Sequence, residues 1–431
     1  WLVFVCTSIV CGLSNEWLIL MTAVYAAVWH LILRCKDQVR DLLQKIQLTF
    51  PGTENITLIT TIETLLYCNT AFVLLMMLLE VSSGQVFSYQ SIVSIFLIAF
   101  IYLANAFERK EENWSYLGMV VFTLGSYALT SAILPVTKYS PWITMFSCGL
   151  MSVGLGYFWS ILGISINKRN PNLTFFTEAC KWMGIALVTI AALDFIAFMA
   201  STEDKGTLAK FGVLAFGSVA IFYFWTAWRL QRELFVYVGE ATIIGILFFT
   251  RLVVPEWFNN DIFRQFWPIG VVAVSFVVLG LSQIFQRVSL DVFIRPSRYT
   301  SFFLTLIPLV GMPLVSSLEI TPVTVLTVAA TTVFYLTVTW IEYDIPYIYI
   351  TCVFLNLTIA VFWAWWGIAF KMHPQLFVAP IGFSLIFITY LNRSDLSLEM
   401  MRRFRSFAGI IIYASSFAEL FTATGFWSPI I

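Results

Sequence analysis

Charged residues inside apolar stretches are the side chains of this sequence best placed to do chemistry. The stretch FFTEACKWMGIALVTIAALDF, 175–195, is apolar enough to lie in a bilayer, yet it contains Glu178, Lys181 and Asp194. Ionisable groups in lipid are costly, and they often mark proton or ion pathways. Glu178 and Lys181 are three residues apart, so they would share one face of a helix and neutralise each other. The stretch is therefore either part of a pathway or a helix with a structural charge pair, and we favour the pair.

Glu63 and Glu240 resemble Glu178 and Lys181 in depth, because each lies about two turns from one end of its apolar stretch. Together these residues would form a layer that lines a vestibule for cations or protons, or they would pair between helices as structural contacts. Glu419, in ASSFAELFTATG, is the deepest acid of its stretch. It is the best single candidate for a proton or cation carrier, and a glutamate paired in a helix contact is the alternative.

The segment LIPLVGMPLVSS, 306–317, contains Pro308, Gly311 and Pro313 within two turns. Proline removes a backbone donor and clashes with the preceding turn, so this spacing predicts a kinked or broken helix. Broken helices form binding sites in several transporters, but prolines that serve only packing are common in membrane spans.

Uncharged polar and small residues in the spans predict packing rather than chemistry. Asn69 and Asn356 fall in the middle of apolar stretches and are expected to form hydrogen bonds between helices. Small residues recur along 142–166 and would let a second helix approach closely. They are Gly149, Ser152, Gly156, Ser160 and Gly163.

The sequence offers no pattern of a known catalytic, cofactor or metal site. It contains no P-loop, no H-E-x-x-H and no paired acids in a sizeable loop. The seven cysteines lie in or beside apolar stretches and none forms C-x-x-C, while the two histidines, His30 and His373, are far apart. We expect no catalytic residue, no cofactor, no metal ion and no nucleic-acid partner.

The composition determines which elements must position these residues. The chain has 431 residues, of which 60% are hydrophobic and 11% charged, and its mean hydropathy is +0.87. Runs of about 20 apolar residues, each long enough to cross a bilayer as a helix, recur along its length. The prediction is an all-α, polytopic transmembrane bundle that forms a single domain, 1–431, with short loops and about fifteen spans. The spans are 1–13, 17–35, 57–80, 87–107, 115–134, 142–166, 173–200, 207–228, 233–254, 267–286, 300–318, 321–343, 346–370, 374–392 and 406–425.

The positions of the basic residues support this series of spans and predict its orientation. Most of the 24 Lys and Arg residues fall in alternate loops, as the positive-inside rule requires of a correct span count. Among these loops are RCKDQVRDLLQK and QRVSLDVFIRPSR. We expect the basic loops to be cytoplasmic and the chain to lie in a bacterial inner membrane.

Two of the basic segments, 36–47 and 395–407, have the pattern of interfacial amphipathic helices. Apolar residues such as Leu42 and Phe404 share one face, and residues such as Arg40 and Arg403 occupy the others. Basic amphipathic helices lie among the headgroups and favour anionic lipid. The alternative is a pair of ordinary solvated connectors.

Two segments resemble a group of uncharacterised membrane proteins. HPQLFVAPIGFSLIFITYLNRSDLSLEMMRRFRSFAGIIIYASSFAELF, 373–421, is similar to the closing part of very large polytopic proteins of planctomycete-type bacteria, and VYVGEATIIGILFFTRLVVPEWF, 236–258, has a similar character. The resemblance implies a long chain with many spans. It assigns no activity and therefore no functional residue. The sequence starts and stops within apolar runs, which also indicates a fragment of a longer chain.

Two functional hypotheses follow from these patterns, with a third much weaker. The first is a non-catalytic structural or assembly subunit of a larger membrane complex with other membrane subunits. The second is a secondary transporter or ion channel that uses the inner-leaflet charge layer and Glu419. A membrane enzyme acting on lipid or glycan has the least support, because the loops are short and poor in catalytic groups. Charges that converge on a hydrated cavity would favour transport, and charges paired one to one would favour the subunit.

Overall fold

The protein is built from helices throughout the part of the chain that its computed structural model describes. A backbone in lipid has no water to bond, so each span satisfies its amides within its own helix. The predicted all-α class is therefore confirmed. The structure describes residues 14–35, 64–76, 87–134, 141–200, 208–253, 255–258, 260–315, 320–342 and 344–423.

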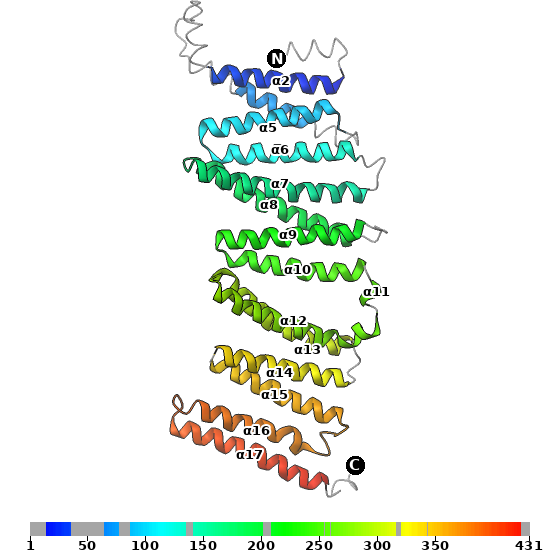
Figure 1. The fold of residues 1–431 in the computed structure, drawn as a ribbon, viewed down its shortest axis with the longest axis vertical. Coiled ribbons are helices and arrows are strands. Elements are labelled where there is room, and N and C mark those ends of the chain that lie inside the picture. Colours follow the sequence, from blue (N-terminus) through cyan, green and yellow to red (C-terminus); the bar gives the residue numbers. More distant parts are fainter. Residues whose placement is uncertain are drawn as a thin grey trace, which may run out of the picture. The chain divides into compact units, whose positions relative to one another are not determined.

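The helices are labelled in chain order in Figure 1. A further apolar helix, Thr64–Met76, precedes α5 in the chain. The labelled helices are α2 (Asn15–Arg34), α5 (Tyr89–Arg109), α6 (Glu112–Ile133), α7 (Pro141–Arg169), α8 (Thr174–Ala200), α9 (Leu208–Leu230), α10 (Glu233–Val253), α11 (Pro255–Phe258), α12 (Asp261–Arg287), α13 (Asp291–Val315), α14 (Pro322–Glu342), α15 (Ile345–Trp365), α16 (Pro374–Leu391) and α17 (Leu398–Ala423).

Ten helices of the described residues are long and apolar enough to cross a membrane. All ten coincide with predicted spans, and this is the architecture of an integral, multi-pass membrane protein. The helices α10, α13 and α17 occupy the positions of three more predicted spans. Other predictions lie outside the described residues, namely the span 1–13, the amphipathic segment 36–47, Glu63 and the outer parts of the span 57–80.

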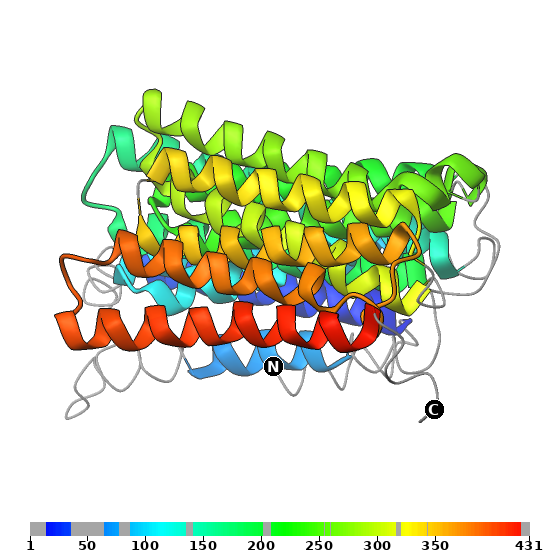
Figure 2. The same cartoon turned by 90° about the horizontal axis from the view of Figure 1, so that it is seen from below.

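The chain forms two compact units, in each of which helices pack on their neighbours in sequence. The first comprises Trp1–Tyr223 with Ala241–Phe249, and the second Phe224–Glu240 with Thr250–Ile431. In the first unit α5 packs along α6, α7 along α8, and α2 against α5. In the second, α12 packs along α13, α14 along α15, and α16 along α17, the last pair being seen side by side in Figures 1 and 2.

The turns between paired helices are shorter than the sequence predicted. The basic segment 286–298 was expected to be a loop, but α12 continues to Arg287 and α13 already begins at Asp291. Three non-glycine residues in such reversals adopt the left-handed region. They are Lys110 (φ 56°), Gln231 (φ 52°) and Ser289 (φ 59°). Charged residues that were read as loop therefore belong to helix ends.

The helix α13 runs through Pro308, Gly311 and Pro313 to Val315, so it is not broken at these positions, and the alternative of a kink there stays a prediction. Membrane helices tolerate proline where their surroundings satisfy the freed backbone groups. Gly311 has a packing role instead. A Cβ atom at this position would lie 2.8 Å from Cη2 of Trp267 on α12, so any larger residue would require the indole to shift.

The second amphipathic segment, 395–407, is also not a separate interfacial helix. Its residues from Leu398 onward form the first turns of α17, which continues without interruption to Ala423. The apolar and basic residues of the segment have helical spacing, as predicted. The helix continues through Ala408 and Gly409 directly into the apolar part.

The small-residue stripe on α7 is confirmed as a packing surface for α8. A Cβ atom added at Gly156 would lie 2.5 Å from Cγ2 of Val188, and one at Gly163 would lie 2.8 Å from Cβ of Cys180. Lipid provides no hydrophobic drive between helices, so close van der Waals contact of this kind stabilises the pair. By contrast, nothing lies within 4 Å of a Cβ added at Gly154, on the same helix.

We therefore predict that Gly156→Val destabilises the protein and that Gly154→Val does not. Overpacking a tight contact typically costs about 1–3 kcal/mol, which would lower the unfolding temperature by several degrees. Thermal unfolding of the detergent-purified variants measures the difference. Equal melting temperatures for the two variants would show that α7 and α8 do not approach as described.

Candidate functional site

Glu178 and Lys181, the first pair of sequence candidates, neutralise each other on α8. Nζ of Lys181 lies 2.5 Å from Oε2 of Glu178, within the helix itself. The same ammonium lies 5.2 Å from the ring centre of Trp182, at the distance of a cation–π contact. The charge of Lys181 is therefore already compensated by its own helix, as the pairing interpretation predicted.

Asp194 lies farther along α8 and does not join that pair. No hydrogen bond or ion pair engages it within the described residues, and its electrostatic neighbours are Tyr127 of α6 and Cys148 of α7. The phenol of Tyr127 is hydrogen-bonded to Ser152 instead, and within the described residues no hydrogen bond links Asp194 to Tyr127 or Cys148. Asp194 therefore forms no reactive constellation in the part of the chain that is described.

Glu240 is bound by hydroxyl groups of a neighbouring helix. The hydroxyl of Thr300 on α13 donates to its Oε2 at 2.5 Å, and that of Ser297 donates to its Oε1 at 3.5 Å. Both donors lie on one face of α13, three residues apart. These bonds satisfy both carboxyl oxygens and join α10 to α13, so Glu240 has the surroundings of a structural contact.

Glu419 lies level with a helix end rather than in the middle of a bundle. Its Oε1 is 2.6 Å from Nδ1 of His373, and the backbone N–H of Gln375 donates to its Oε2 at 3.3 Å. His373 is the N-cap residue of α16, which begins at Pro374. The carboxyl group therefore caps the free amides of α16, where a negative charge is also favoured by the helix dipole.

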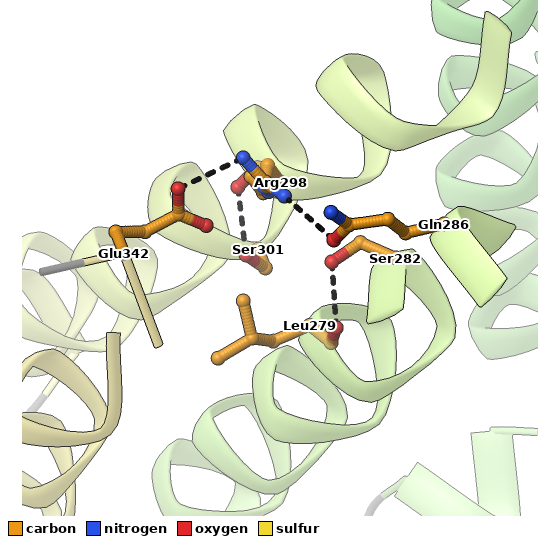
Figure 3. Close-up of polar contacts among 6 residues, drawn as sticks. All are labelled: Leu279, Ser282, Gln286, Arg298, Ser301 and Glu342. Carbon is orange, nitrogen blue, oxygen red and sulfur yellow. Dashed lines mark hydrogen bonds and ion pairs between the residues drawn. The ribbon is translucent and has the colours of Figure 1, made fainter. Parts of the chain in front are cut away.

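A further charged cluster, on α12, α13 and α14, was missed by the sequence reasoning. Figure 3 shows Arg298 of α13 between Glu342 of α14 and Gln286 of α12. Nη1 of Arg298 lies 2.9 Å from Oε2 of Glu342, and Nη2 lies 3.4 Å from Oε1 of Gln286. Only 22% of the Arg298 side chain and 20% of the Glu342 side chain are exposed. The cluster therefore ties three helices of the second unit together.

A hollow of about 500 Å³ lies beside this cluster, at the turn that joins α12 to α13. Polar residues from the turn before α10, the start of α10, the end of α12 and the start of α13 line most of it. The side chain of Arg295 is 73% exposed, and its Nη1 lies 4.0 Å from Oε1 of Glu233. The polar lining residues are Gln231, Glu233, Gln286, Asp291, Arg295 and Arg298.

The signal for this hollow was present in the sequence but was hidden by the assignment of a loop. Arg295 and Arg298 are three residues apart, which places both on one face only if the segment is helical. The predicted loop between two spans does not place these two arginines on a shared face.

The predicted bonds of the two mid-span asparagines differ in outcome. The predicted hydrogen bond between helices is confirmed for Asn356 of α15, because its Nδ2 donates to the hydroxyl of Ser384 on α16 at 3.0 Å. The predicted hydrogen bond is not found for Asn69, because its Nδ2 has no hydrogen-bond partner although only 1% of the residue is exposed. Within the described ranges, moreover, no three His, Cys, Asp or Glu side chains gather where they could hold a metal ion.

We predict that the Arg298–Glu342 pair contributes measurably to stability. Arg298→Gln or Glu342→Gln alone leaves a largely buried charge without its partner, so each should cost about 1–3 kcal/mol. The double variant should cost less than the sum of the two. Denaturant unfolding of all three variants in detergent measures this coupling.

The matched control for this cycle is the Arg403–Glu399 pair of α17. Its side chains are 76% and 75% exposed, so its coupling should be within about 1 kcal/mol of zero. Equal coupling in the two pairs, or strictly additive costs at Arg298 and Glu342, would contradict a structural role for the cluster.

Comparison with known proteins gives no homologue from which a role can be transferred to these residues. No family model matches the chain, and no match is found among curated proteins or solved structures. The functional argument therefore depends on the geometry of the chain's own residues.

Proposed function

We propose that this chain is a structural subunit of a larger membrane complex, a non-catalytic helical scaffold. The observation that carries the proposal is the pairing of its ionisable side chains. Arg298 binds Glu342, His373 binds Glu419, and Lys181 binds Glu178, each in a separate place. A transporter needs such groups to converge on a shared hydrated cavity, and these groups are used one by one as structural contacts.

The location of the hollow supports the same interpretation. It lies at the ends of α12 and α13, beside their connecting turn, and its lining includes none of Glu178, Glu240 and Glu419. An ion pathway through the described helices would require those carboxylates to share a cavity with one another or with a substrate.

Apolar surface is available for other membrane subunits. Only 6% of the most apolar window of α15 is buried within the chain itself, and Val353 and Leu355 are among its exposed residues. Lipid covers such faces equally well, so exposure alone does not identify a partner. It does leave a broad surface on which further transmembrane helices can pack.

The proposal includes an orientation, a location and a lipid preference. Fifteen spans would place the basic helix ends, among them Arg109 and Arg287, on the cytoplasmic side of a bacterial inner membrane. On that side the segment 36–47 and the first turns of α17, which contain Arg402 and Arg403, would contact anionic lipid headgroups.

The experiment that tests the proposal is a measurement of native mass and composition. The chain is extracted gently from its own membrane and analysed by native mass spectrometry with protein identification. We expect other membrane proteins in fixed stoichiometry with it. A monomer or homo-oligomer without partners would contradict the subunit proposal and leave transport as the better hypothesis.

A flux measurement provides an independent check. We predict that the purified chain in vesicles shows no ion-coupled flux above the leak of empty vesicles, and that Glu419→Gln and Glu240→Gln do not change this. Both glutamates are bound to neighbouring residues, so neither is expected to carry ions. Flux that disappears in Glu419→Gln, while the variant protein remains folded and abundant, would support a transporter instead.

A further inference from the structure

The hollow at the turn between α12 and α13 has the size and position of a ligand site. Its volume of about 500 Å³ lies within the usual range of about 300–1,000 Å³ for small-molecule pockets. The 27 residues of α12 span roughly 40 Å as a helix, more than the roughly 30 Å of a hydrocarbon core. The end of α12 therefore reaches the layer of lipid headgroups, and the hollow lies there.

The charges of the lining are balanced rather than of one sign. Arg295 and Arg298 supply two positive charges, and Glu233 and Asp291 supply two negative ones. The two carboxylates disfavour a simple anion, and the two guanidinium groups disfavour a simple cation. A ligand that carries both charges side by side matches this surface.

The positive part of the lining is suited to a phosphate group. Arg298 is held in place through Nη1 and Nη2 by Glu342 and Gln286, so its charge has a fixed position. The side chain of Arg295 is 73% exposed. Its Nη1 lies 4.0 Å from Oε1 of Glu233, which is too far for a good hydrogen bond. Its guanidinium is therefore available to bind phosphate oxygens in the bidentate manner typical of arginine.

The negative part is suited to a primary ammonium group. Asp291 is exposed at the start of α13, and within the described residues no hydrogen bond or ion pair engages its carboxylate. The Nε2 of Gln231 donates to the carbonyl oxygen of Trp228 at 2.6 Å, which leaves its Oε1 free to accept. An ammonium group donates three hydrogen bonds and would satisfy both acceptors, whereas a quaternary ammonium has no N–H to donate.

We propose that this hollow binds the headgroup of an aminophospholipid, with the phosphate on Arg295 and the ammonium on Asp291. Phosphoethanolamine joins these two groups by two carbons, and a lipid is the source we favour. Large apolar side chains beside the lining residues in sequence, including Ile284, Leu234 and Val288, are exposed. They provide surface for acyl chains next to a headgroup, which a soluble ligand would not use.

The test compares two lipids with identical acyl chains that differ only in the headgroup. Delipidated protein in detergent is titrated with phosphatidylethanolamine or phosphatidylcholine, and bound lipid is measured by native mass spectrometry. Wild-type protein should bind the ethanolamine lipid about tenfold more tightly, because only its ammonium can donate hydrogen bonds to Asp291. Equal affinity for the two lipids would overturn the proposal.

Variants at two exposed positions separate the two halves of the site. Arg295→Gln should weaken both lipids about tenfold, because both contain the phosphate, whereas Asp291→Asn should remove only the preference for ethanolamine. Arg264→Gln, an exposed arginine in the first turn of α12 that does not line the hollow, is the matched control and should change neither affinity. A preference that survives Asp291→Asn would refute the assignment of the ammonium.

Competition with soluble O-phosphoethanolamine identifies the source of the headgroup. If the ligand is a lipid, the soluble compound should displace it only at concentrations at least about a hundredfold higher, since it lacks acyl chains to bury. Displacement at equal concentration would show a site for a soluble phosphoethanolamine and would overturn the lipid assignment. The proposed subunit function is tested by native composition, so either result is independent of it.

Discussion

The need of every backbone amide for a hydrogen bond inside a water-free solvent determines the rest of this structure. Helices meet that need alone, so each apolar stretch becomes a helix before it has any partner. Many side-chain hydroxyl groups also find a hydrogen-bond partner within their own helix. Thr327 and Thr331 of α14, for example, each donate to the carbonyl oxygen four residues earlier. Other polar groups, such as Arg298 and Glu342, join neighbouring helices instead.

The helices were predictable from the sequence because one property, a run of apolar residues, determines them. The ends of the helices were not predictable, because charged residues there can either form a loop or continue the helix. Charged residues such as Arg295 and Arg298 are typical of loops in water, yet at the end of a membrane helix they continue the helix into the headgroup layer. The helix α13 consequently begins at Asp291, nine residues before the predicted start of its span. Pro308 lies inside α13 for a related reason, since surrounding groups in a membrane protein can satisfy the backbone oxygen that proline leaves free.

The partners of the candidate residues were only partly predictable. Glu178 and Lys181 lie within one helical turn, so their pairing follows from spacing alone. Glu419 and His373 are distant in sequence and meet only because α16 and α17 lie side by side. A single sequence does not encode that neighbourhood in any local pattern. The hollow depends on both kinds of information, because its lining combines adjacent turns of α13 with residues from α10 and α12.

The packing of each helix on its neighbour in sequence has a consequence for the synthesis of the chain. A ribosome delivers α7 and then α8, and the glycine-lined contact between them needs no residue from any later helix. Nothing in such a pair has to wait for a distant segment, and the entropy lost in closing each loop is small. Low separation between contacting residues is the feature that speeds folding in other proteins. The described part of this chain is thus arranged to assemble hairpin by hairpin, in the order in which it is translated.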